Sequence, residues 1–167
     1  SATAYFFAKE LQQILKVPIG IIQTAWGAST IESWMDSASL NGFAGNTIPK
    51  IVPEKDPNRT PTIMYNSMLH PFVGYSIRGF TWYQGEANRP NASIYQDLMA
   101  AMIGSWRKQW NNEKLPFYFV QIAPFEPGEW NSALLREAQL KAMHSIPNTG
   151  MVVTLDLGER TVIHPAE

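Results

Sequence analysis

The chain of 167 residues contains no cysteine, which excludes disulfide bonds, thiolate catalysis and cysteine-ligated metal centres. It also lacks an excess of either charge, because 13 Lys and Arg stand against 14 Asp and Glu, for a formal net charge of −1. A balanced charge gives no attraction for a nucleic-acid backbone or an anionic membrane, so we expect neither as a partner. No apolar run approaches the roughly 20 residues that a membrane-spanning helix needs.

The first residues lack the marks of a natural beginning. Ser1 is not an initiator Met, and no basic residues precede the apolar stretch that follows it, so the pattern of a signal peptide is missing. Helical periodicity begins at once, at residue 2. We therefore expect this chain to be the interior of a longer polypeptide.

The composition is that of one globular domain, with 45% hydrophobic and 16% charged residues. Apolar periodicity predicts helices over residues 2–16, 31–35, 63–69 and 131–146. Asn131 is expected to cap the last of these. Ser93 and Gln96 form a capping box, which predicts the start of a further helix. Short apolar runs predict strands over residues 18–25, 77–83, 117–122 and 151–155. Residues 41–61, which are rich in proline, glycine and asparagine, are expected to be irregular.

Strands that alternate with long helices are typical of βαβ units. We therefore predict an α/β fold with a mostly parallel sheet and helices on both faces, within a single domain that spans residues 1–167. In such sheets the ligand sites lie beyond the carboxyl ends of the strands. Polar clusters follow three of the predicted strands, at residues 27–30, 84–88 and 156–164. Taken singly, each cluster could also be ordinary turn chemistry.

Together the clusters resemble a known family. Residues 26–34 (WGASTIESW), 82–88 (WYQGEAN) and 156–165 (which begins DLGE and ends IHP) are similar to three signature segments of the sialate O-acetylesterase family. That family belongs to the SGNH-hydrolase superfamily and is related to acetylxylan esterases. Residues 65–71, 106–110 and 135–139 fit the same family's spacing.

The resemblance implies a three-layer, flavodoxin-like SGNH domain that removes acetyl groups from a carbohydrate without a cofactor. It also implies a periplasmic or secreted location. His164 would be the general base for a serine nucleophile. The backbone N–H of Gly27 and the side chain of Gln84 would stabilise the oxyanion, with Asn88 as an alternative to Gln84. We expect Gly27, Gln84 and His164 to converge at one rim of the sheet.

The sequence departs from the superfamily pattern in two places. The superfamily has an Asp two or three residues before the His, where this chain has Thr161 and Val162. The group that orients His164 could be Glu86, Asp156, Glu159 or a backbone carbonyl, and of these we favour Glu86.

The second departure concerns the nucleophile. The family carries it in a Gly-Gln-Ser-Asn segment after its first strand, and residues 1–167 contain no such segment and no Gly-x-Ser-x-Gly. Ser29 stands where the family places an oxyanion contributor. We therefore expect the first strand to be missing, so that the chain is a partial SGNH domain whose serine lies in an upstream segment. Four tryptophans in or beside the site loops could pack on sugar faces: Trp26, Trp34, Trp82 and Trp130.

Two other functions remain open at this point. The absence of a nucleophile is compatible with a non-catalytic carbohydrate-binding or partner-dependent piece. A metal-dependent hydrolase would use Asp156, Glu159 and His164, although the chain has no His-x-x-x-His pair.

Overall fold

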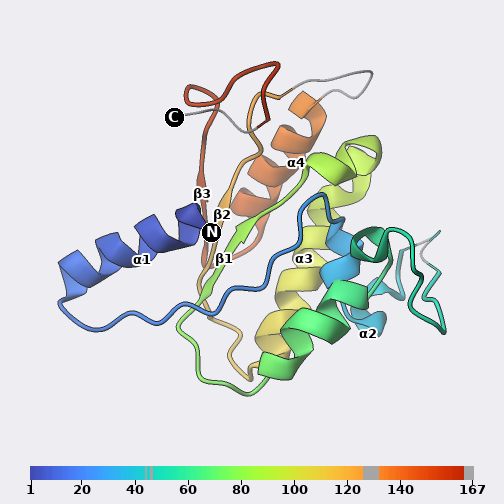
Figure 1. Ribbon diagram of the computed structural model, residues 1–167, viewed down its shortest axis with the longest axis horizontal. Helices are drawn as coiled ribbons and strands as arrows, with labels where there is room; N and C mark the ends of the chain where they lie inside the picture. The colour runs from blue at the N-terminus through green and yellow to red at the C-terminus, as the bar shows by residue number, and fades with distance from the viewer. Residues whose placement is uncertain (44, 46, 126–131, 164–167) are drawn as a thin grey trace.

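Three short parallel strands form the centre of the molecule. The computed structural model describes residues 1–43, 45, 47–125 and 132–163 (Figure 1). The strands β1 (Phe80–Tyr83), β2 (Phe117–Val120) and β3 (Thr149–Val152) lie side by side in the order β1-β2-β3. Both pairs are parallel, with Phe80 opposite Phe117 and Phe117 opposite Thr149. The predicted α/β class with a parallel sheet is confirmed.

Two long helices connect the strands and cover one face of the sheet (Figure 1). The helix α3 (Ala92–Gln109) joins β1 to β2, and α4 (Ser132–Ser145) joins β2 to β3. The apolar stripe of α3 packs against the sheet, and its residues Leu98 and Met102 are fully inaccessible to solvent. Side chains on this face of the strands form an aromatic core with α3 and the 31–34 segment: Trp34, Trp82, Trp106, Phe117 and Phe119.

The other face of the sheet is more open. Because side chains alternate along a strand, Tyr83, Tyr118 and Val152 point away from α3 and α4, and all three are exposed. The helix α1 (Ala2–Leu15) contacts this face, with the ring of Phe7 6.2 Å from that of Tyr118. None of the described helices is long and apolar enough to cross a bilayer.

Short helical turns build the region beside α3. They are η1 (Ile31–Trp34), α2 (Ser37–Leu40), η2 (Pro57–Arg59), the π-helical η3 (Tyr65–Leu69), η4 (His70–Phe72) and η5 (Glu86–Asn91). The helices expected near residues 31–35 and 63–69 are thus present. The described part of 41–61 has only η2 as a regular element, as expected.

The strand expected over residues 18–25 is wrong. This segment has no regular secondary structure and pairs with no strand of the described sheet, and Ile21 and Ile22 are exposed. A strand needs a neighbour for its backbone N–H and C=O groups, and nothing in the described residues supplies one here. Apolar content alone could not reveal this.

Some element boundaries also differ from the predictions. The expected capping box at Ser93 is wrong, because η5 runs directly into α3 and Asn91 occupies the N-cap position. The strand β3 begins at Thr149 and ends at Val152, two residues earlier at its start and three earlier at its end than predicted. The predicted cap Asn131 lies outside the described residues, as do Trp130 and His164.

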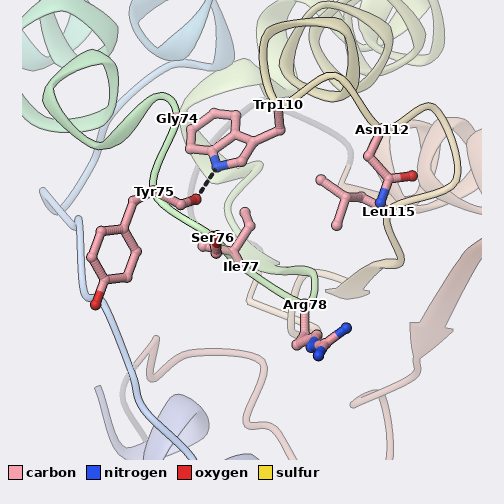
Figure 2. A pocket seen from close by; sticks show the side chains of 8 residues that line it. All are labelled: Gly74, Tyr75, Ser76, Ile77, Arg78, Trp110, Asn112 and Leu115. Atoms are coloured by element: carbon pink, nitrogen blue, oxygen red, sulfur yellow. Dashed lines mark hydrogen bonds between the residues drawn. The ribbon is translucent and has the colours of Figure 1, made fainter.

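A hollow of about 360 Å³ lies at the amino-terminal end of the sheet (Figure 2). Its walls are the loop 74–78, which leads into β1, together with Trp110, Asn112 and Leu115, which precede β2. The indole N–H of Trp110 donates to the carbonyl of Tyr75 at 2.8 Å. This hollow is at the opposite edge from the strand ends where the sequence predicts the site, so it is a separate feature.

The side chain of Asp36 ties α2 to α3. It caps α2 by accepting from the Ser39 N–H at 2.9 Å, and it also accepts from the Ser105 hydroxyl and from Gln109 Nε2 on α3. Burial alone would raise the pKa of Asp36, but the hydrogen bonds from Ser105 and Ser39 outweigh it and lower the pKa below its usual range.

We expect Asp36→Asn to destabilise the protein at neutral pH by about 1–3 kcal/mol, because the amide keeps an oxygen that can cap α2 but loses the charge-assisted hydrogen bonds from Ser105 and Gln109. Because the carboxyl pKa is lower in the folded than in the unfolded state, its contribution is complete above the unfolded pKa of about 3.9 and is lost as the pH falls through the folded value. Urea unfolding of both proteins at pH 7 and pH 3 measures this. The difference should shrink at pH 3, whereas Asp97→Asn, at an exposed position of α3, should have little effect at either pH.

Adjacent leucines of α4 provide a matched test of the packing. Leu135 is fully buried, whereas Leu134 is 57% exposed. Leu135→Ala should lower the free energy of unfolding by about 2–5 kcal/mol through lost burial and the cavity left behind. Leu134→Ala should change it by less than about 0.5 kcal/mol. Equal urea midpoints for the two variants would contradict the placement of α4.

Candidate functional site

Two segments far apart in the sequence meet beyond the carboxyl end of β1. The loop 84–88 leaves β1, and the turn 27–30 leads into η1. The side chain of Gln84 joins them, because its Nε2 donates to the carbonyl of Ser29 at 2.8 Å and to Oδ1 of Asn88 at 2.7 Å. Two of the three polar clusters predicted from the sequence are thus brought together.

Asn88 is the centre of this contact. It is 1% exposed, and its Oδ1 also accepts from the backbone N–H of Ile31 at 2.9 Å. Its Nδ2 donates to the carboxylate of Glu32 at 2.9 Å. Glu32 is itself buried, at 7% exposure. The loop and η1 are therefore locked together by buried, charge-assisted and neutral hydrogen bonds.

Gln84 is also held from the helices beneath it. The hydroxyl of Tyr95 donates to Gln84 Oε1 at 2.8 Å, and Gln139 Nε2 donates to the Gln84 carbonyl at 3.2 Å. Gln139 Oε1 accepts from the N–H of Ile122 at 3.0 Å, just past β2. Tyr95 and Gln139 are fully buried, and burial raises the pKa of Tyr95. Every polar atom of the Gln84 side chain therefore has a protein partner.

The backbone at Gly85 requires a glycine. Its φ is +156°, and a Cβ there would lie 2.7 Å from side-chain carbons of both Ile122 and Leu135. Only a residue without a side chain allows the loop to turn this tightly over β2 and α4. This contact sets the direction in which the loop leaves the sheet.

The turn that contains Gly27 is fixed from the side by η2. Asn58 Nδ2 donates to the Gly27 carbonyl at 2.8 Å, and Arg59 Nε donates to the Ala28 carbonyl at 3.2 Å. Ala28, rather than Gly27, has a positive φ, of 54°. A Cβ placed on Gly27 would meet no atom within 4 Å, so the described packing leaves open space there.

The hydroxyl of Ser29 is already engaged. Its Oγ accepts from the indole N–H of Trp34 at 2.8 Å, and the residue is 6% exposed. A nucleophilic serine needs an accessible Oγ within reach of a base. The geometry of Ser29 therefore agrees with a structural role.

Trp34 and Trp82 do not face solvent, contrary to our expectation that they could pack on sugar. They are 3% and 8% exposed, and their rings pack edge to face at 6.1 Å. Burial of these large apolar rings against α3 is more favourable than their exposure at the rim. Trp26, in contrast, is 52% exposed beside the turn.

Glu86 lies in the first turn of η5 and is half-buried. Burial raises the pKa of Tyr83, and the negative charge of Glu86 raises it further. The carboxylate is therefore near the end of β1, two residues from Gln84. Its predicted role with His164 stays a prediction, because His164 lies outside the described residues.

The segment that leads toward His164 comes after β3 in the chain and lies beside the end of β2. Thr154 Oγ1 donates to the Gln121 carbonyl at 3.0 Å, and a Cβ on Gly158 would lie 2.4 Å from Pro124 Cδ. Residues 154–158 thus run along the carboxyl edge of the sheet. Asp156 and Glu159 are exposed on this segment. Within the described ranges, no three His, Cys, Asp or Glu residues are grouped closely enough to hold a metal ion.

Sequence reasoning missed Glu32, Tyr95 and Gln139 as members of the network. Tyr95 and Gln139 each lie on the buried side of a long helix, where a polar residue among apolar ones needs an internal partner. That position in the apolar pattern was the available signal. Glu32 lies within the 26–34 motif, but no pattern in the sequence indicates its burial.

Comparisons with known proteins agree on one family. The family model described as "Carbohydrate esterase, sialic acid-specific acetylesterase" matches residues 2–165. The sialate O-acetylesterases of Homo sapiens and Rattus norvegicus are 29% and 27% identical to the whole of this chain. The chain spans only 36% of the human protein and 40% of the rat protein.

Two solved structures are also similar to this chain. The crystal structure of a carbohydrate acetylesterase from Xanthomonas citri matches 96% of this chain with a TM-score of 0.83 and 43% identity, over 36% of its own length. A protein from Arabidopsis thaliana shares the fold, with a TM-score of 0.63 and 24% identity over 93% of this chain and 59% of its own.

The central position of Asn88 leads to a test. Asn88→Ala removes the acceptor of the buried Ile31 N–H and the partner of Glu32. We therefore expect the free energy of unfolding to fall by at least about 1–3 kcal/mol. Asn91→Ala is the matched control, since Asn91 is exposed and its side chain makes no capping hydrogen bond. Urea unfolding compares the two. If both variants were as stable as the wild type, the buried network would be contradicted.

Proposed function

This chain belongs to the carbohydrate esterase family of sialic acid-specific acetylesterases, and we propose that it forms part of an enzyme that removes acetyl groups from acetylated carbohydrates. The observation that carries the proposal is the junction of loop 84–88 with the turn 27–30 beyond the end of β1. This is the edge at which parallel α/β sheets bind ligands. The acetylated sugar is the substrate in this proposal, and no cofactor is required.

The proposed reaction is acyl transfer through a serine. His164 takes the proton of the serine hydroxyl as its oxygen attacks the acetyl carbonyl, and then gives that proton to the leaving sugar oxygen. Water next attacks the acetyl-enzyme, with the same base, to release acetate and restore the serine. The course of residues 154–158 along the carboxyl edge supports a place for His164 near the site.

We place the nucleophilic serine outside residues 1–167. This rests on the chemistry of Ser29, whose Oγ is buried and occupied by Trp34. It also rests on the absence of a Gly-Gln-Ser-Asn or Gly-x-Ser-x-Gly segment from this sequence. An upstream segment of the same protein would supply the serine.

Gly27 and Gln84 are the proposed oxyanion donors. The open space at Gly27 lets a substrate oxygen approach the backbone. Gln84 uses both amide hydrogens within the protein, so in this mechanism one of them moves from the Ser29 carbonyl or Asn88 to the acetyl oxygen as negative charge develops there. Asn88 is more deeply buried than Gln84, which favours Gln84 as the donor and Asn88 as its support.

Glu86 is the proposed group that orients His164. It is half-buried near the end of β1, whereas Asp156 and Glu159 are exposed. A carboxylate sheltered from water holds an imidazolium more strongly than an exposed one.

One observation favours a second function, that of a carbohydrate-binding piece without catalysis. Every polar atom of the Gln84 amide is bonded within the protein, as expected for a side chain that has a structural role and does not donate to an oxyanion. Binding of an acetylated sugar without release of acetate, by the full-length protein, would decide for this alternative.

The esterase proposal is tested with the full-length protein on an acetylated sugar. His164→Ala should lower kcat by about 100-fold or more, as expected for loss of a general base, and wild-type activity should fall on the acid side as an imidazole protonates near pH 6.5. His144→Ala, at an exposed position of α4, should leave kcat unchanged. Full activity of His164→Ala would rule out the proposed base.

The position of the nucleophile is tested in the same assay. Residues 1–167 alone should release no acetate, and the longer polypeptide should release acetate in a manner blocked by serine-directed inhibitors. Inhibitor-sensitive turnover by residues 1–167 alone would place the nucleophile within this chain.

A further inference from the structure

Tyr95 contacts the site from the interior, outside the motifs that mark the family. It lies in the first turn of α3 and is 0% exposed. Its hydroxyl donates to Gln84 Oε1 at 2.8 Å and lies 3.2 Å from the Gln84 carbonyl. No other side chain of the described residues makes a hydrogen bond to Oε1 of Gln84.

The two ends of a glutamine amide have opposite chemistry, because Oε1 only accepts and Nε2 only donates hydrogen bonds. The Ser29 carbonyl and Asn88 Oδ1 only accept here, so they select the orientation with Nε2 toward the turn 27–30, and the Tyr95 hydroxyl supplies the donor that Oε1 then needs on the side of α3. Full burial raises the pKa of Tyr95 far above its ordinary value. The phenol consequently remains a donor throughout the neutral pH range.

The opposite orientation is poorly satisfied. If the amide were reversed, Oε1 would face the Ser29 carbonyl and Asn88 Oδ1, which places three acceptors together. Nε2 would then face the Tyr95 oxygen. The backbone of Gln84 cannot shift to relieve this, because Gln139 Nε2 donates to its carbonyl and Gln139 is fixed in turn by the Ile122 N–H.

We propose that Tyr95 is a positioning residue of the esterase, which holds Gln84 with Nε2 toward the turn 27–30, so that one amide hydrogen can move from its protein partner to the acetyl oxygen during the reaction. This inference rests on the proposed function and deepens it. Tyr95 does not touch the substrate, and it acts only through Gln84. Its contribution is greatest in the transition state, where an oxyanion donor has its main effect.

The first test is Tyr95→Phe in the full-length enzyme, assayed on 4-nitrophenyl acetate and on an acetylated sugar. We expect kcat to fall by about tenfold, the order expected for one lost hydrogen bond, and KM to change by less than about twofold. Tyr75→Phe is the matched control, because Tyr75 is 64% exposed at the opposite end of the sheet, and it should leave both constants unchanged. Rates are divided by the number of active sites titrated with a serine-directed inhibitor, so a partly unfolded variant is still measured correctly.

The second test separates positioning from general stabilisation. In a Gln84→Ala background, Tyr95→Phe should lower kcat by less than about twofold, because the group through which it acts is gone. A merely structural role would give the same fall in kcat in both backgrounds. Such equal falls would overturn the inference, as would a tenfold change confined to KM.

The outcomes also distinguish this inference from the proposed function. Absence of acetate release by the wild-type full-length protein would refute the esterase proposal, and the inference with it. Wild-type turnover together with an unchanged kcat for Tyr95→Phe would refute only the role of Tyr95.

Discussion

Buried polar groups need hydrogen-bond partners, and this requirement determines how the segments pack at the carboxyl edge of the sheet. Gln84 and Asn88 bring two amides into an interior where an unpaired donor or acceptor costs about 1–3 kcal/mol. Their hydrogen bonds are met by Ser29 and Glu32 on one side and by Tyr95 on the other. The position of η1 and that of the first turn of α3 are thus both set by the loop between β1 and α3.

This constraint links segments more than 50 residues apart in the sequence. Asn88 and Ile31 are 57 residues apart, and the bond between them joins the 3-10 helix η1 to the sheet. A site assembled in this way depends on tertiary structure, and no single segment contains it.

Local patterns were sufficient for the fold class, because the helical stripe of α3 and the apolar runs of β1 and β2 reflect burial directly. They failed at residues 18–25, where the same apolar character occurs without a neighbouring strand in the described part of the chain. They also failed for Trp34 and Trp82, since a sequence does not show which side of a rim a ring will occupy. The motif 82–88 indicated Gln84 and Asn88, but the support from Tyr95 and Gln139 depends on how the helices pack against the sheet.

The edge-to-face indoles of the core have an optical consequence. Trp82 lies 6.1 Å from Trp34 and 5.7 Å from Trp106, in fixed and asymmetric surroundings. Rings held in this way produce near-ultraviolet circular dichroism, which disappears when specific packing is lost even if the helices persist. Because the Trp34 N–H is bonded to Ser29, part of this signal comes from a side chain that also supports the turn beside Gly27. The protein therefore contains a built-in spectroscopic reporter of whether that edge of the sheet is assembled.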